Sequence, residues 1–208
     1  DIINSGFKKQ KTPKKYLNNP IEQLDDLPVI DFSLYEKYLK EFTTLSISLS
    51  RGCPLNCSFC TEKKLIEGVG NLHKKWRSYT PKRAKIEFES MFQFGEINNI
   101  RSYAFYDPIF GFNRQWLLKF LDFYPIEPDF HVWTECRLDV LNEDVLTKLA
   151  ARKVSLMYGL ESYSKKMLSI MNKTKNPTQY IEKFNEIMKI SQKLDMFCIL
   201  NIIIIHPG

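Results

Sequence analysis

The sequence predicts an α/β protein with a parallel sheet, in the form of a partial (β/α) barrel with about five βα units. From Thr44 onward, short β-rich runs alternate with longer amphipathic runs, which is the pattern of βαβ units. No glycine-rich phosphate loop follows the first strand, so a barrel is favoured over a doubly wound sheet. The chain has 208 residues, of which 44% are hydrophobic and 26% are charged, and it can bury a sizeable core.

Residues 1–42 are expected to form a connector. They are polar, carry Pro13, Pro20 and Pro28, and show no sustained helical or strand period before "SLYEKYLKEF". The lysine-rich stretch "KKQKTPKK", Lys8–Lys15, contributes to a modest net charge of +6. No aromatic residue lies among these lysines, so a solvated linker is favoured over a nucleic-acid contact.

The first two strands are expected on either side of one helix. "TLSISLS" alternates as a half-buried strand does, and "RSYAFYDPIF" is the second β-rich run. Between them, "TPKRAKIEFESMFQF" begins with Thr80 as N-cap and Pro81 in the first helical position. Ile86, Met91 and Phe94 follow at roughly helical spacing. This segment is the first predicted crossover helix.

The alternation continues to the end of the sequence. The helix "NRQWLLKFLDFY", capped by Asn113, precedes the strand "FHVWTECRL", and "NEDVLTKLAAR", capped by Asn142, precedes "KVSLMYGLES". The helices "SKKMLSIMNK" and "TQYIEKFNEIMKISQKL" then lead to a fifth strand, "MFCILNIIII". The apolar face of the helix "NRQWLLKFLDFY" comprises Trp116, Leu117, Phe120 and Leu121. Functional residues are expected just after the carboxyl ends of the strands, because these ends share one edge.

Three of the five cysteines lie in "SRGCPLNCSFC", at CxxxCxxC spacing. Offsets of zero, four and seven would also place Cys53, Cys57 and Cys60 on one face of a buried helix. Gly52 and Pro54 indicate a loop instead, since proline restricts the preceding residue to extended conformations. The three thiols are therefore expected to be metal ligands.

A structural zinc ion would need a fourth ligand. His73, Cys136 and Cys198 could provide one only by long-range folding, and the latter two cysteines are expected to be small buried hydrophobes within strands. Thiolates also suit iron-sulfur clusters, and three of them hold three irons of a four-iron cluster and leave the fourth iron open. A zinc module or an electron-transfer module is the non-enzymatic alternative.

The cysteine pattern also bears on the compartment. Five is an odd number, and three thiols lie too close together for a disulfide framework, so a reducing cytoplasm is favoured. The longest apolar run, in "CILNIIIIHPG", is too short to span a bilayer, and no membrane partner is expected. The absent initiator methionine and the abrupt ending suggest a piece of a longer polypeptide.

The cysteine loop resembles that of a known family. "CPLNCSFC", with an aromatic residue before the third cysteine, is similar to the CxxxCxΦC loop of the radical S-adenosylmethionine (SAM) superfamily. The resemblance implies a 4Fe-4S cluster held by Cys53, Cys57 and Cys60, with S-adenosylmethionine chelated by the open iron. It further implies a reductant such as ferredoxin or flavodoxin, and reductive cleavage of S-adenosylmethionine to a 5'-deoxyadenosyl radical that acts on a substrate that the sequence leaves unknown.

The resemblance assigns roles after the first three strands. Phe59 would lie against the adenine. Asp107, in "YDPIF", would accept from the ammonium group, although the glycines usual there are absent and aspartate before proline is also ordinary turn chemistry. Glu135 and Arg137, in "WTECRLD", would point to the same side and bind a polar ligand, and a plain ion pair between them is an equal alternative.

Further roles fall after the fourth strand. Glu161 and Ser162, in "GLES", would contact the ribose hydroxyls. Lys173, in "MNK", would reach the methionyl carboxylate, although an exposed lysine at a helix C-terminus is commoner. The final "IIIIHPG" resembles a GxPG turn near the adenine, with His206 in place of the usual glycine. A packed or solvated histidine is favoured there over a catalytic one.

The resemblance covers residues 43–208, which would be a radical SAM core truncated before the last of six βα units. "PIEQLDDLPVIDFSLYEKY" is similar to the connector that follows a cobalamin-binding domain in cobalamin-dependent members. This likeness makes cobalamin a further expected cofactor, carried by a domain upstream of this chain. Cobalamin-dependent members typically transfer methyl groups. An RNA-modifying methylthiotransferase is the alternative enzyme, and the lysine stretch is the only hint of it.

Overall fold

The five predicted strands form one parallel sheet. The structure, a computed structural model, describes residues 21–39, 43–62, 75–126 and 128–206. The strands pair in the order β1-β4-β5-β6-β7, each parallel to its neighbour. Their bounds are β1 Thr44–Ile47, β4 Ser102–Phe105, β5 His131–Cys136, β6 Val154–Glu161 and β7 Cys198–Ile202. The α/β class and a parallel sheet of five strands are confirmed.

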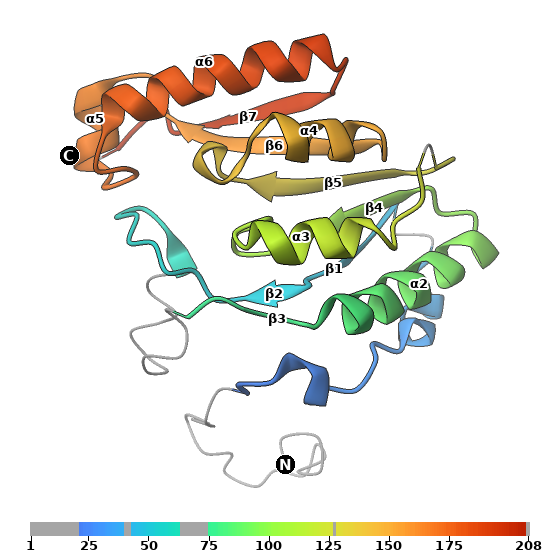
Figure 1. Cartoon of the computed structure of the whole chain (residues 1–208). Coiled ribbons are helices and arrows are strands. Elements are labelled where there is room, and N and C mark those ends of the chain that lie inside the picture. The colour runs from blue at the N-terminus through green and yellow to red at the C-terminus, as the bar shows by residue number, and fades with distance from the viewer. Residues whose placement is uncertain (1–20, 40–42, 63–74, 127, 207–208) are drawn as a thin grey trace, which may run out of the picture.

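Helices connect the successive strands. Figure 1 shows α2, α3, α4 and α6 covering one face of the sheet, while α5 lies near the end where the strands finish. Their bounds are α2 Pro81–Ile97, α3 Arg114–Leu121, α4 Glu143–Ala150, α5 Lys165–Ile170 and α6 Pro177–Lys193. A short 3-10 turn, η4 (Leu138–Val140), follows β5. Because all five strands run the same way, their carboxyl ends meet at one edge, and this edge carries the candidate site.

Polar side chains cap the helices as the sequence predicts. The side chains of Thr80, Asn113 and Asn142 each accept a hydrogen bond from a backbone N–H in the first turn of α2, α3 and α4. Ser164 and Asn176 do the same for α5 and α6. Each cap satisfies a backbone donor that the helix itself cannot. The caps therefore fix where each crossover helix begins, and hence how long each strand-to-helix loop is.

The core lies between the sheet and its helices. On β6, Val154, Leu156, Tyr158 and Leu160 are buried in alternation with partly exposed residues, as expected for a strand with one covered face. The predicted apolar face of α3 is confirmed, because its four members are at most 8% exposed. Aromatic rings fill the space between α2 and the sheet, with Phe88 and Tyr124 at 4.9 Å between ring centroids.

The structure differs from the prediction in the first strand. "TLSISLS" is divided into β1 and a second short strand, β2 (Ser50–Arg51), which pairs antiparallel with β3 (Arg77–Ser78). The chain thus leaves the parallel sheet before the cysteine loop begins. On α2, Ile86 is 48% exposed, and the buried positions are Ala84, Glu87, Phe88, Met91 and Gly95.

Residues 21–38 pack against the domain. They form two 3-10 helices, η1 (Leu24–Asp26) and η2 (Phe32–Tyr38), and bury Leu24 and Phe32 in the core. The carboxylate of Asp25 accepts from the backbone N–H and the hydroxyl of Thr80. These contacts tie the described part of the expected connector to the first turn of α2, while its role as a connector between domains stays a prediction.

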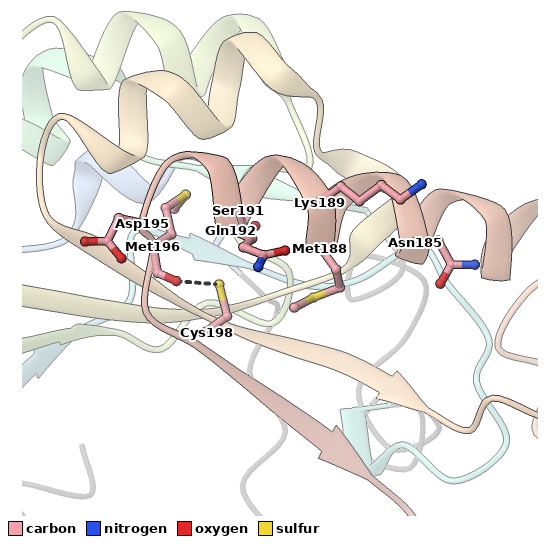
Figure 2. Close-up of a pocket in the computed structure, with 8 residues that line it drawn as sticks. All are labelled: Asn185, Met188, Lys189, Ser191, Gln192, Asp195, Met196 and Cys198. Carbon is pink, nitrogen blue, oxygen red and sulfur yellow. Dashed lines mark hydrogen bonds between the residues drawn. The ribbon is translucent and has the colours of Figure 1, made fainter.

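β7 is an edge strand of the described sheet. A groove of about 660 Å³ runs between α6 and β7, and Figure 2 shows Met188, Met196 and Cys198 among the residues around it. The Cys198 thiol donates to the carbonyl oxygen of Met196 at 3.5 Å. Within the described ranges, no helix has both the length and the apolar character needed to cross a membrane.

Candidate active site

The cysteine segment is a loop, not a helix. Gly52, at φ 78°, turns the chain out of β2 in a left-handed conformation that favours glycine. No regular helix covers the three cysteines, so the alternative of a buried helical stripe is excluded. Cys57 is buried, whereas Cys53 and Cys60 are partly exposed. Burial raises the pKa of the Cys53 thiol, with smaller contributions from the neighbouring thiols.

The three cysteines line one cavity of about 190 Å³ at the carboxyl edge of the sheet. Figure 1 shows the segment after β2 and helix α5 at this same end. Of the residues to which the sequence assigns a role, Phe59, Glu135, Arg137, Glu161 and Lys173 line the cavity with them. The remaining lining residues are Leu55, Pro108, Ile109, Cys136, Gly159 and Asn201. Residues separated by about 150 positions are thus brought together by the parallel strand ends.

The cysteine loop rests on the C-terminal turn of α5. The backbone N–H of Ser58 donates to the carbonyl of Met171 at 2.9 Å. The side-chain amide of Asn172 donates to the carbonyl of Asn56 at 2.7 Å. Both contacts satisfy loop backbone groups that would otherwise need water. They fix the middle of the loop, next to Cys57, before any metal is present.

Arg137 links three segments of the site. Its guanidinium donates to both carboxylate oxygens of Asp139, at 2.9 and 2.7 Å, and to the carbonyl of Lys173 at 2.8 Å. It also donates to the sulfur of Cys57 at 3.5 Å. Burial lowers the pKa of Arg137, but the hydrogen bonds to Asp139 and its negative charge, with contributions from Cys57 and Tyr180, together outweigh this, and the pKa is raised. The salt-bridge partner of Arg137 is Asp139, so the predicted alternative of a pair with Glu135 is wrong.

Glu161 and Lys173 form a buried ion pair beside the cavity. The Nζ–Oε1 distance is 2.9 Å, and the side chains are 4% and 11% exposed for lysine and glutamate respectively. The Lys173 ammonium also lies 5.8 Å from the centre of the Phe59 ring. Glu161 has φ 64° at the very end of β6. Lys173 is therefore buried rather than the exposed helix-end lysine that the sequence offered as the commoner alternative.

Two residues with expected roles lie outside the lining. Asp107 is buried, and its Oδ1 accepts from the backbone N–H and the hydroxyl of Ser50. Its Oδ2 is buried and has no hydrogen-bond partner among the described residues. Ser162 accepts from the N–H of Ser164 and so shapes the turn before α5. The structure gives both side chains partners within the protein, and their roles toward S-adenosylmethionine stay predictions.

Sequence reasoning missed two residues that shape the cavity. A Cβ atom on Gly159 would lie 2.8 Å from Oε1 of Glu161 and 3.0 Å from Nζ of Lys173, so this position needs glycine for the ion pair to lie where it does. The glycine in "GLES" was the available signal. Asn201 interrupts the apolar run of β7 and reaches the same cavity. A single amide within such a run could have been recognised as facing a polar site.

The donor set fits a thiolate-bound iron cluster and a charged ligand. Among the described residues, no three His, Cys, Asp or Glu side chains lie close enough to share one metal ion. In a four-iron cluster, by contrast, each thiolate binds its own iron. Arg137 and Lys173 provide positive charge for the cysteine thiolates and for a carboxylate of the ligand. Glu135 and Glu161 provide hydrogen-bond acceptors for the ligand.

Comparisons with known proteins bear on the family and the fold of this chain. The family model of the Radical SAM superfamily matches residues 47–208. An uncharacterized methyltransferase of Pyrococcus horikoshii is 25% identical over 193 residues, which are 90% of this chain and 39% of that protein. The solved structure of the cobalamin-dependent S-adenosylmethionine radical enzyme OxsB, with aqua-cobalamin bound, matches with a TM-score of 0.62 and 17% identity.

A second structural match is the radical S-adenosylmethionine methyltransferase TsrM from Kitasatospora setae, with cobalamin and a [4Fe-4S] cluster bound, at a TM-score of 0.60 and 16% identity. The matched regions cover 79% and 80% of this chain, but only 24% of OxsB and 32% of TsrM. The chain thus spans well under half of the length of these relatives. Because the family model covers the cysteine loop and every strand after β1, the chain belongs to the radical SAM superfamily of enzymes.

Proposed function

We propose that this chain is the part of a radical SAM enzyme that binds a 4Fe-4S cluster through Cys53, Cys57 and Cys60 and cleaves S-adenosylmethionine. One observation carries the proposal: the three thiols line the same cavity as two carboxylates and two cations. When bound, the cluster and S-adenosylmethionine supply an electron transfer that yields methionine and a 5'-deoxyadenosyl radical. The electron comes from a reductant of the ferredoxin or flavodoxin class.

The residues of this chain bind and orient the ligand. Phe59 offers an apolar ring face to the adenine, and Glu161 accepts hydrogen bonds from ribose hydroxyls. Lys173, held by Glu161 at 2.9 Å, presents its charge to the methionyl carboxylate. Burial of this ion pair limits access of water to that side of the cavity, which strengthens these electrostatic contacts.

The finer proposal is methyl transfer with cobalamin. Two observations support it: the similarity of the segment from Pro20 to Tyr38 to the connector of cobalamin-dependent members, and the cobalamin-bound structures among the matches. Cobalamin would be bound by a domain outside this chain. Cobalamin absorbance that copurifies with the parent polypeptide, and is lost when the preceding domain is deleted, is the expected result. The lysine stretch that hints at RNA lies outside the described residues.

Iron and sulfide analysis of single variants tests the cluster. After anaerobic reconstitution, Cys53→Ala, Cys57→Ala and Cys60→Ala should each lose the cluster, since two thiolates do not hold three irons. Cys136→Ala is the matched control, because Cys136 lines the same cavity but is a buried residue of β5 outside the cysteine loop. Cys198→Ala, in β7, is the second control.

Both controls should keep the iron and sulfide content of the wild type. A cluster that disappears in Cys136→Ala would show that the ligand set is wrong. A colourless protein that binds zinc through the same three cysteines would contradict the proposal as a whole.

A further inference from the structure

The guanidinium of Arg137 is buried between the cysteine loop and the two segments that support it. Arg137 directly follows the last residue of β5 and is 8% exposed. Its donors reach the sulfur of Cys57 at 3.5 Å, the carboxylate of Asp139 in η4, and the carbonyl of Lys173 after α5. The centre of the guanidinium also lies 5.9 Å from the ring centre of Tyr180.

We propose that Arg137 is a positioning residue for the cluster, which donates a charge-assisted hydrogen bond to the thiolate of Cys57 and raises the reduction potential of the bound cluster. The inference rests on the proposed function, since it assumes that Cys57 is a cluster ligand. It replaces the role of S-adenosylmethionine ligand that the sequence suggested for this arginine.

The hydrogen bonds that Arg137 already makes explain why it is assigned to the cluster and not to S-adenosylmethionine. An arginine has five N–H donors. Nε and Nη2 are directed at Asp139 and the carbonyl of Lys173, and Nη1 donates to Cys57. These contacts use four of the five donors, so a bidentate contact with the methionyl carboxylate, which needs two, would break at least one of these bonds. The structure therefore favours a fixed cation at the sulfur over a mobile ligand-binding one.

The direction of the effect follows from charge. The reduced cluster is more negative than the oxidised one, so a fixed positive charge at a ligand sulfur stabilises the reduced form more. Hydrogen bonds to cluster sulfurs are among the factors that set these potentials. Asp139, whose side chain is 41% exposed, partly neutralises that charge. Removing either partner should therefore move the potential, in opposite directions.

Midpoint potentials of reconstituted variants test the inference. A dithionite titration followed by electron paramagnetic resonance should give Arg137→Gln a lower potential than the wild type. At a fixed applied potential, the ratio of reduced to oxidised cluster should fall about tenfold, which corresponds to about 59 mV for a one-electron couple. Asp139→Asn should raise the potential, because the guanidinium charge is then less neutralised.

The matched control is Arg152→Gln. Arg152 is also a buried arginine, at 9% exposure, but it donates to the carbonyls of Leu121 and Lys148 and precedes β6, at the amino edge of the sheet. Its potential should equal that of the wild type. Circular dichroism and iron content identify variants that fail to fold or to load.

The outcomes separate the two proposals. A wild-type protein that binds no 4Fe-4S cluster overturns the proposed function, and this inference with it. If the cluster binds normally and its midpoint potential in both Arg137→Gln and Asp139→Asn equals that of the wild type, only the role of Arg137 is overturned. Should Arg137→Gln fail to load, Asp139→Asn decides alone: a raised potential supports the role, and an unchanged or lowered one overturns it.

Discussion

The carboxyl group of Asp107 is buried beside the first residues of the cysteine loop. Oδ1 accepts two hydrogen bonds from Ser50, whereas Oδ2 is buried and has no partner in the part of the chain that the structure describes. Burial raises the pKa of Asp107 from 3.8 to about 6, against the hydrogen bonds from Ser50 and the charge of Arg51, which lower it. The contact with Ser50 helps to fix where the chain leaves the parallel sheet.

The raised pKa of Asp107 predicts a pH dependence of stability. The folded state binds this proton more tightly than the unfolded state, so its contribution to the free energy of unfolding falls as pH rises from about 4 to about 6. Relative to Asp107→Asn, the wild type should lose up to about 3 kcal/mol between pH 4 and pH 7. Urea unfolding of both proteins at several pH values measures the difference.

Asp129→Asn is the control for this experiment, since the Asp129 side chain is 72% exposed. Its difference from the wild type should be nearly constant over the same pH range. An equally constant difference for Asp107→Asn would mean that this carboxyl group is not protonated preferentially in the folded protein.

At the scale of elements, local signals predicted the helices and strands well. Caps such as Thr80 and Asn142 act through neighbouring backbone groups, so their effect is readable from a short window. The pairing of β2 with β3 joins residues 26 and 28 positions apart, Arg51 with Arg77 and Ser50 with Ser78, which no local pattern encodes. The 3-10 helices at residues 24–38 are short and stabilised by contacts with α2, which periodicity does not reveal.

In the candidate site, too, local sequence signals predict some features, and long-range contacts determine the others. The cysteine spacing is a local signal, and the loop conformation agrees with it. The partners of Arg137 and Lys173 depend instead on how η4 and α5 pack at the strand ends. A choice between Glu135 and Asp139 as the partner of Arg137 needs three-dimensional distances. For this reason the sequence placed residues at the right edge but left their contacts open.

The ion pair that joins the end of β6 to the segment after α5 supports a prediction at this scale. Glu161→Ala leaves the Lys173 ammonium buried without its carboxylate and removes the proposed ribose acceptor. S-adenosylmethionine should bind more weakly by about 1 to 3 kcal/mol, while the cluster assembles normally. A binding titration with the reconstituted parent enzyme measures the change.

Glu186→Ala is the matched control, because it breaks a surface ion pair with Lys183 at a similar distance, 2.8 Å, on α6. Its affinity should match the wild type. Unchanged affinity in Glu161→Ala would remove Glu161 from the set of ligand-binding residues and leave it a partner of Lys173 alone.

For the molecule as a whole, the two edges of the sheet differ. Near β1, residues 21–38 pack on α2 and contribute to the core. At the other edge, β7 carries exposed apolar side chains: Ile202 is 59% exposed, and Ile204 and Ile205, just beyond it, are 92% and 86% exposed. The groove between α6 and β7 (Figure 2) adds apolar surface from Met188 and Met196. Unpaired strand edges of this kind favour pairing with another chain.

This edge predicts that the 208-residue chain, produced alone, self-associates through β7. Ile202→Lys should lower the association, because a charge on an edge strand opposes pairing between chains. Sedimentation velocity at two or more protein concentrations measures the fraction of monomer. Ile97→Lys is the control, since Ile97 is 81% exposed at the end of α2 and outside the sheet, and it should associate as the wild type does.

The same reasoning predicts that a chain extended through one further strand and helix is monomeric, because the added strand pairs with β7 and the added helix covers the neighbouring apolar surface. After reconstitution and reduction, the extended chain should also cleave S-adenosylmethionine to 5'-deoxyadenosine faster than the 208-residue chain. If the 208-residue chain is already a monomer with the same cleavage rate, then β7 is not an edge that needs a partner, and the core is complete without a further βα unit.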